Sequence, residues 1–211
     1  NITNNIMHDD QMQHGRAVEA DFLINSVANT EGKLAKFVAG HWEDAWLEGT
    51  KLVEKIYGVP IEGLADCVIA SAGGYPKDIN LYQGVKTQVN AVLACKPGGF
   101  VILLMELPDI HEPEEFLGWF DTRDLQEREI KLRNGFTVPG FIAFHLGEDF
   151  QKYHHILVTK PENKAICDRV GIDVVTSIDE ALELAGKLLG RDDYSVTVMP
   201  LASNTVPLVN K

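Results

Sequence analysis

The feature that most constrains the fold is an alternation of apolar runs and amphipathic segments that begins near residue 65. Each apolar run has the length and composition of a strand buried in a sheet, and segments with helical spacing separate the runs. The runs are DCVIA (66–70), FVILLMEL (100–107), HILVT (155–159), DVVTS (173–177) and YSVTVMP (194–200). Strands joined by helical crossovers predict a three-layer α/β domain with a mostly parallel sheet and flanking helices.

Helices are expected in the intervening segments. The predicted helices cover residues 80–95, 138–153 and 177–190, with shorter ones in 112–120 and 124–135. The sequence KPGG (96–99) is expected to end the first of them. Ser177 is the predicted N-cap of the 177–190 helix and Gly190 its stop.

The first sixty residues follow a different pattern. A short stretch with helical character comes first, followed by strand-like runs at 22–27 and 33–40 and a helix over 41–61 that Gly58 and Pro60 stop. We therefore predict a boundary near residue 62: residues 1–62 form the end of an incomplete N-terminal domain, and 63–211 a C-terminal α/β domain. Because the chain opens NITNNIMHDD without an initiator Met, we expect it to be a fragment.

Charge and cysteine content exclude several classes of protein. The net charge is −12 and the sequence contains no basic cluster, which argues against nucleic-acid binding. The three cysteines, Cys67, Cys95 and Cys167, are far apart and predict buried thiols, not a disulfide or a zinc site. The absence of a long apolar run or signal peptide predicts no membrane span, and we expect a cytoplasmic protein.

The stretch SAGGYPKDINLYQGVK (71–86) follows the first predicted strand of the α/β domain. Ligands in such domains bind outside the carboxyl ends of the strands. Gly73 and Gly74 permit backbone conformations closed to other residues and allow a ligand to approach closely. Either Asp78 or Asn80 is expected to cap the helix that follows.

The helix after this turn has two predicted faces. Its apolar stripe is Leu81, Val85, Val89 and Leu93, and its polar stripe is Gln83, Lys86, Thr87 and Asn90. Gln83 and Lys86 project from one side of the first turns, where a lysine opposes the helix dipole unless an anion is bound. The alternative is a plain strand-to-helix turn with a solvated polar face. The turn is not GxGxxG, so a Rossmann dinucleotide site has little support.

The motif at 71–86 resembles that of the nickel-pincer lactate racemases and related 2-hydroxyacid racemases and epimerases. The matching positions are Gly73, Gly74, Pro76, Asp78, Tyr82, Gln83 and Lys86. The resemblance extends to FLINSVAN (22–29), to residues 37–61 and through the α/β region to about residue 160. It implies a two-domain isomerase, of which this chain holds the end of the first domain and the whole second.

The resemblance also implies a chemistry. In that family nickel sits in a nucleotide derived from nicotinic acid, hydride moves between C2 of a 2-hydroxyacid and this cofactor, and two histidines act as acid and base. By resemblance, Gln83, Lys86 and Tyr82 contact substrate and cofactor, and His8, in the NxxH context of residues 5–8, ligates nickel. The catalytic histidine pair, the tethering lysine and the substrate arginine lie upstream in family members. We assign no catalytic residue here and expect the isolated fragment to be inactive.

Several further residues have simpler readings. The six other histidines are expected at the surface, in loops or at helix ends: His14, His41, His111, His145, His154 and His155. Trp42 and Trp46 are expected to pack, and Phe150 stands where the family often has a tryptophan. We expect His8 to be exposed or poorly ordered in this fragment. The alternative to an enzyme is a non-catalytic α/β module that binds a small anion.

Overall fold

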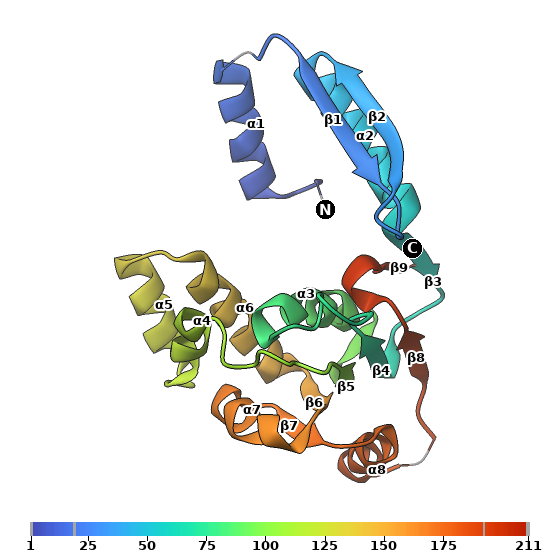
Figure 1. Cartoon of the computed structure of the whole chain (residues 1–211), viewed down its shortest axis with the longest axis vertical. Coiled ribbons are helices and arrows are strands. Elements are labelled where there is room, and N and C mark those ends of the chain that lie inside the picture. The colour runs from blue at the N-terminus through green and yellow to red at the C-terminus, as the bar shows by residue number, and fades with distance from the viewer. Residues whose placement is uncertain (1, 19, 192, 210–211) are drawn as a thin grey trace. The chain divides into compact units, whose positions relative to one another are not determined.

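The computed structural model describes residues 2–18, 20–191 and 193–209. The chain forms two compact units that divide between Gly58 and Val59 (Figure 1). Among the described residues, no helix is long and apolar enough to cross a bilayer.

The first unit is a two-stranded hairpin with two helices. It contains α1 (Ile6–Val18), β1 (Leu23–Ala28), β2 (Leu34–Gly40) and α2 (Trp42–Tyr57), and β1 pairs with β2 in antiparallel register. Both predicted strands and the long helix are confirmed. The helix ends at Tyr57 because Gly58 adopts an extended conformation.

The core of the first unit is small. On the hairpin face that packs against α2, Val27 and Val38 are buried, and Ala45 of α2 is buried with them. Helix α1 has no buried residue. It contacts α2 where Gly15 meets the ring of Trp42, at a distance that leaves no room for a Cβ atom.

The second unit contains the predicted parallel sheet. Its strands are β4 (Ala65–Ser71), β5 (Cys95–Leu104), β6 (His154–Val158), β7 (Asp173–Val175) and β8 (Val196–Met199), in the order β7-β6-β5-β4-β8. Every neighbouring pair is parallel, which confirms the predicted α/β class. A second small sheet, which was not predicted, pairs β3 (Gly58–Ile61) with β9 (Val206–Val209).

The helices of this unit follow the predicted order. They are α3 (Leu81–Val92), α4 (Glu114–Leu117), α5 (Leu125–Asn134), α6 (Val138–Lys152), α7 (Lys164–Val170) and α8 (Ile178–Leu189). Ser177 caps α8 by accepting from the backbone N–H of Glu180, and Gly190 ends it with φ +66°. Helix α7 was not predicted. The sequence KPGG belongs to the start of β5, because α3 already ends at Val92.

Alternate residues of the central strands face two separate cores. Val68 and Ala70 of β4 point into a large cluster with residues of α3, α4 and α6. Cys67 and Ile69 point to the opposite face, where Ala181 of α8 covers them. This alternation is the pleat of a strand buried on both faces, and it gives the three layers seen in Figure 1.

The three cysteines are buried and unpaired, as predicted. Burial raises the pKa of the Cys67 thiol to about 11 and that of Cys95 and Cys167 to about 12. Thiols held in this protonated form are poor nucleophiles and poor metal ligands.

Candidate functional site

The strand order places a ligand crevice at one point of the sheet. From β4 the chain moves outward through β5, β6 and β7, and then returns to place β8 on the other side of β4. Crevices in such sheets open outside the carboxyl ends of the strands where this direction reverses. Here that point lies between the segments that follow β4 and β8.

The glycine turn after β4 is closely packed against the segment that follows β8. Gly73 and Gly74 have φ of +87° and +81°, a conformation that favours glycine. A Cβ atom on Gly73 would lie 2.9 Å from Cδ2 of Leu201. Ser203 donates its hydroxyl to the carbonyl of Ala72 at 2.7 Å. The chain itself therefore closes the β4/β8 crevice beside Gly73.

Two polar side chains fix the start of α3. Asn80 is its N-cap and accepts from the backbone N–H of Gln83 at 2.9 Å. Asp78 instead accepts from the backbone N–H of Glu106 at 3.1 Å, which joins the glycine turn to the segment after β5. Of the two predicted caps, Asn80 is therefore the actual one, and Asp78 holds the neighbouring loop.

Gln83 and Lys86 lie together on the solvent side of α3. The Lys86 ammonium donates to Oε1 of Gln83 at 2.9 Å, with Gln83 half-buried and Lys86 exposed. Among the described residues, Lys86 forms no ion pair with a carboxylate. The pair thus presents a positive charge near the first turns of a helix, where backbone N–H groups add to the attraction for an anion.

Tyr82 is anchored in the core. Its half-buried ring packs edge-on against Phe116 of α4, with ring centroids 5.6 Å apart. This contact attaches the first turn of α3 to α4 next to Gln83. Tyr82 therefore has a packing role in this structure, whatever its contact with a ligand.

The predicted faces of α3 are partly wrong. Val89 and Leu93, expected in the apolar stripe, are 44% and 45% exposed, whereas Thr87, expected on the polar face, is completely buried. The buried side is centred on Gly84, which lies so close to the sulfur of Met105 that a Cβ atom would clash. Glycine has no side chain and therefore adds nothing to the hydrophobic periodicity. The periodicity alone thus predicted the wrong buried face for α3.

A buried polar network holds the inner side of α3. The amide nitrogen of Gln88 donates to Oδ2 of Asp149 on α6 at 2.9 Å and faces Nε2 of His155 on β6 at 3.3 Å. Nδ1 of His155 lies 3.2 Å from the carbonyl of Tyr153. A neutral ring protonated on Nδ1 satisfies both contacts. Sequence reasoning missed this network because its members come from three distant elements with no shared spacing.

Of the six histidines other than His8, His155 is the one whose predicted surface position is wrong. It is 6% exposed, and burial lowers its pKa to about 4. The ring of Phe150, on α6, packs against it with centroids 4.8 Å apart. Phe150 therefore belongs to the packing around the network. The neighbouring His154 is exposed, as predicted, and stacks on Phe100.

His8, the predicted nickel ligand, lies on α1 in the first unit. Asn5 accepts from the backbone N–H of His8 at 3.3 Å, so the NxxH sequence begins the helix. The imidazole is half-buried and stacks on the indole of Trp46, with centroids 5.0 Å apart and planes inclined by 16°. The ring is thus less exposed than predicted, because Trp46 covers one of its faces.

The described residues contain no cluster of three or more histidine, cysteine or acidic side chains that could hold a metal ion. His8 therefore fits a metal only as a single imidazole ligand, with the remaining donors supplied from elsewhere. Imidazole suits nickel, and a cofactor that brings its own donor atoms needs few protein ligands.

A second charged cluster lies at the amino ends of the strands, opposite the glycine turn. Backbone and side-chain hydrogen bonds from Ser195 hold the pKa of the Asp66 carboxyl well below its ordinary range, and Lys96 and Arg191 pair with the same carboxylate. Asp66 stands at the amino end of β4, away from the glycine turn. It ties the segment before β8 to the sheet, and we assign it a structural role.

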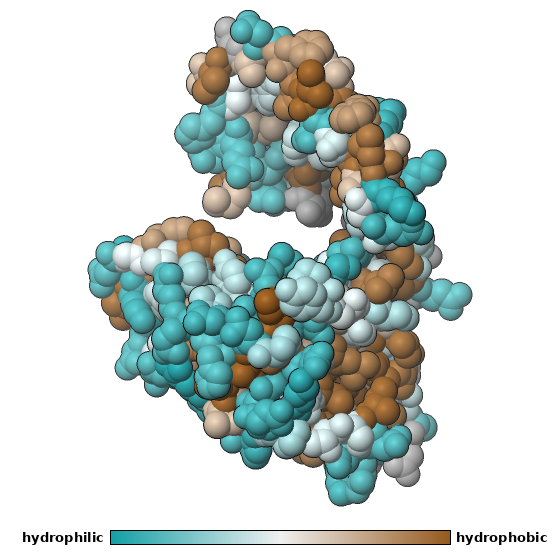
Figure 2. Space-filling model, viewed as in Figure 1, coloured by the Kyte–Doolittle hydropathy of each residue, from teal (hydrophilic) through white to brown (hydrophobic). Residues whose placement is uncertain are grey.

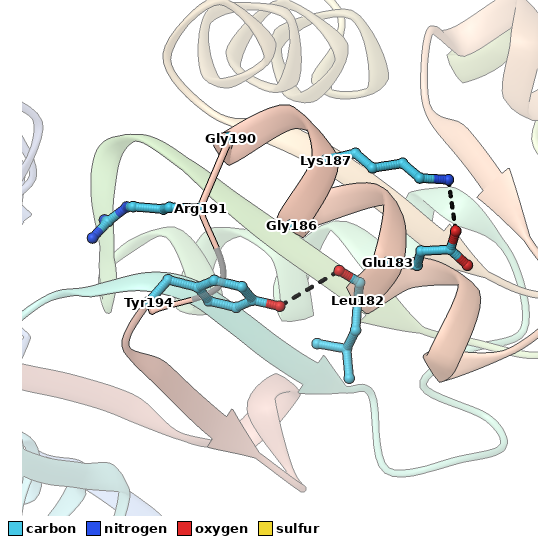
Figure 3. Close-up of a pocket in the computed structure, with 7 residues that line it drawn as sticks. All are labelled: Leu182, Glu183, Gly186, Lys187, Gly190, Arg191 and Tyr194. Carbon is cyan, nitrogen blue, oxygen red and sulfur yellow. Dashed lines mark hydrogen bonds and ion pairs between the residues drawn. The ribbon is translucent and has the colours of Figure 1, made fainter.

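A hollow of about 440 Å³ adjoins that cluster at the end of α8 (Figure 3). Its two cations are already paired: Lys187 with Glu183 at 2.6 Å and Arg191 with Asp66 at 2.8 Å. In Figure 3 the Tyr194 hydroxyl points to the carbonyl of Leu182, in a long hydrogen bond of 3.5 Å. Despite its size, we do not assign this hollow as the anion site, because both of its cations are already paired with carboxylates.

The remaining histidines are surface groups, as predicted. His14, His41, His111 and His145 are exposed. His41 precedes the first residue of α2, and His145 lies 2.9 Å from the carboxylate of Glu148.

Comparisons with known proteins agree with the motif around the glycine turn. A family model described as the lactate racemase C-terminal domain matches residues 62–206, more than half of the chain. The chain is 31% identical over 204 residues to a lactate racemase of Thermoanaerobacterium thermosaccharolyticum, covering 94% of this chain and 47% of that protein. It is 27% identical over 205 residues to a lactate racemase of Lactiplantibacillus plantarum, covering 95% and 48%.

Solved structures show the same relationship. The lactate racemase apoprotein from T. thermosaccharolyticum superposes with a TM-score of 0.88 at 30% identity, over all of this chain and 51% of that one. A Thermotoga maritima protein at 12% identity and TM-score 0.59 shares the fold, over 90% of this chain and 49% of that one. The chain spans about half the length of the curated relatives it matches. Because the model of the lactate racemase C-terminal domain matches more than half of this chain, the chain belongs to the lactate racemase family.

Proposed function

We propose that the chain is the C-terminal part of a nickel-pincer-dependent racemase or epimerase of lactate-type 2-hydroxyacids. In this proposal residues 1–62 are the end of the catalytic and cofactor domain, and residues 63–211 are the C-terminal α/β domain. The missing N-terminal domain supplies the acid and base histidines. The observation that carries the proposal is the exposed Lys86 ammonium beside Gln83, on the helix that follows the glycine turn.

Recognition of the substrate follows from the charge of this pair. A 2-hydroxyacid carries a carboxylate and a hydroxyl group at adjacent carbons. The Lys86 ammonium attracts a carboxylate, and the Gln83 amide both donates and accepts hydrogen bonds. Because Asn80 and the Tyr82 packing fix the start of α3, both groups are held before the substrate arrives.

The cofactor is assigned by chemistry and resemblance. When bound, a nickel-pincer nucleotide would supply an acceptor for the hydride at C2. His8 would ligate the nickel, and its half-buried ring, stacked on Trp46, has few orientations open to it. Lys86 would also balance the negative charge of a nucleotide. The cytoplasmic location expected from the sequence stays a prediction.

The first test removes the Lys86 charge in the full-length enzyme. We expect Lys86→Ala to lower kcat/KM for lactate racemisation by about ten- to a hundredfold, because a lost charge-assisted hydrogen bond costs roughly 1.5–3 kcal/mol. Chiral chromatography of the two lactate enantiomers measures the rate.

A matched control for this test is Lys187→Ala. Lys187 is also an exposed lysine of a helix, and it is paired with a residue one turn earlier, Glu183. We expect Lys187→Ala to leave the rate within twofold of the parent enzyme, because Lys187 lies on α8, which covers the opposite face of the sheet from α3. Near-normal kinetics in Lys86→Ala would contradict the assignment and return the pair to a solvated helix face.

The second test concerns the metal. In the purified holoenzyme, His8→Ala is expected to reduce nickel content, measured by elemental mass spectrometry, because an imidazole ligand is lost. His14→Ala, on the same helix and exposed, is the control and should retain nickel. Equal nickel in both variants would remove His8 from the metal site.

A further inference from the structure

The hairpin of the first unit has one face that none of the described elements of this unit covers. On the side facing α2, Val27 and Val38 are each 6% exposed. On the other side, Ile24 is 70%, Phe37 62% and Leu34 57% exposed. We call this uncovered side, which also includes Ala39 opposite Ile24, the outer hairpin face. In Figure 2, brown apolar atoms lie over β1 and β2 in the upper part of the view.

Such a face is unusual for a strand pair in water. Strands that alternate between core and solvent place polar residues on the wet side, whereas strands apolar on both faces are buried on both. Apart from Ser26, which lies opposite Phe37, the outer hairpin face has apolar side chains such as Ile24 where polar ones are expected. Contiguous apolar surface of this kind marks a contact with another part of a protein.

The hairpin is also incomplete as a sheet. It consists of β1 and β2 alone, so the outer edge of each strand has no neighbouring strand among the described residues. A two-stranded sheet needs a layer packed on it to be stable in water, and here α2 supplies that layer on the inner face only. Among the described residues, the outer hairpin face and the free strand edges are therefore both open to a partner.

We propose that the outer hairpin face is the packing surface for the polypeptide that precedes this chain in the full-length protein. This inference rests on the proposed function only in taking the chain as a C-terminal part. Two observations favour that occupant over a second copy. The C-terminal domain model matches residues 62–206 and leaves the hairpin outside it. The relatives are about twice as long as this chain.

The placement has a consequence for the cofactor. α1, which carries His8, is held in this unit by contacts with α2, such as the Arg16–Glu43 ion pair at 2.9 Å and the stacking of His8 on Trp46. Helix α2 in turn packs on the inner face of the hairpin. Packing of the preceding polypeptide on the outer hairpin face would thus stabilise the hairpin and α2, and through α2 the helix α1 that carries the proposed nickel ligand His8.

Thiol labelling of the full-length protein tests the proposal. The native cysteines of this chain are 0–1% exposed, so an introduced thiol is readily distinguished by peptide mass spectrometry. Ala39→Cys places a thiol on the outer hairpin face with little change of volume. Phe136→Cys is the control, at a residue 68% exposed in the second unit. We expect the residue 39 thiol to react with a maleimide at least about tenfold more slowly, because a covered thiol reacts only when its cover opens.

A photo-crosslinker identifies the cover. p-Benzoylphenylalanine in place of Phe37, in the full-length protein, should cross-link to peptides that precede this chain. Equal labelling of the two thiols, or cross-links only to residues 59–211 or to a second molecule, would overturn the proposal. Racemisation is measured on the same samples. If the face is protected but the protein does not racemise lactate, the packing proposal is supported and the proposed function is refuted. If the protein is active but the face is unprotected, the proposed function is supported and the packing proposal is refuted.

Discussion

Residues 59–211 and residues 1–58 differ in how their apolar side chains are used. The larger unit buries apolar clusters on both faces of its sheet, with Phe100, Ile102 and Phe116 almost wholly enclosed. In the smaller unit, the buried apolar residues among those described are Val27, Val38 and Ala45. The difference shows that a regular hairpin-and-helix pattern in a sequence does not establish a complete core.

The largest expected difference between the two units is in stability. Phe116→Ala in this chain should cost about 3–5 kcal/mol of unfolding free energy, because the ring, on α4, is fully buried against Tyr82 of α3 and Phe120. Ile24→Ala should change it by less than about 0.5 kcal/mol, since the side chain is 70% exposed. Urea denaturation followed by circular dichroism measures both.

The stability cost of Ile24→Ala should differ between this chain and the full-length protein. There we expect a cost of about 2–5 kcal/mol, typical of a buried isoleucine, if the outer hairpin face is covered. A cost that stays near zero would show that the smaller unit is complete as it stands.

A smaller, pH-dependent effect should be confined to the larger unit. Burial lowers the pKa of His155 to about 4, from 6.5 in the unfolded chain. The unfolded state therefore binds the proton more tightly, and stability falls as pH decreases from about 6.5 to 4, by up to about 3 kcal/mol. Urea midpoints of the parent chain and His155→Gln, measured across this range, should show this part of the decline only in the parent. Parallel curves would contradict the neutral, buried histidine.

Much of the larger unit could be predicted from its sequence. The five apolar runs became the five parallel strands, because strands buried on both faces need continuous apolar residues. Ser177 and Gly190 bounded α8 as expected, since capping depends on local backbone geometry. The motif at 71–86 indicates the family from the sequence alone, and the family match confirms it.

What could not be predicted depends on contacts between distant elements. The rotation of α3 is set by Gly84 against Met105 and by Gln88 against Asp149, and neither pair has a signature in local periodicity. His155 looked like a surface residue because it follows another histidine at the start of a short strand. The stacking of His8 on Trp46 joins two helices that are separated by the hairpin. The roles proposed for His8, Tyr82, Gln83 and Lys86 stay predictions.

The central claim is that this chain is one part of an enzyme whose acid and base lie in the preceding part. Its most direct test measures lactate racemisation by the nickel-loaded full-length protein and by the isolated 211-residue chain supplied with the same cofactor. Circular dichroism first establishes that the isolated chain is folded. Removal of the hydroxyl proton while hydride leaves C2 needs a positioned base, so we predict interconversion of the lactate enantiomers by the full-length protein and none by the isolated chain. Turnover by the isolated chain, or a full-length holoenzyme unable to racemise any 2-hydroxyacid, would contradict the account.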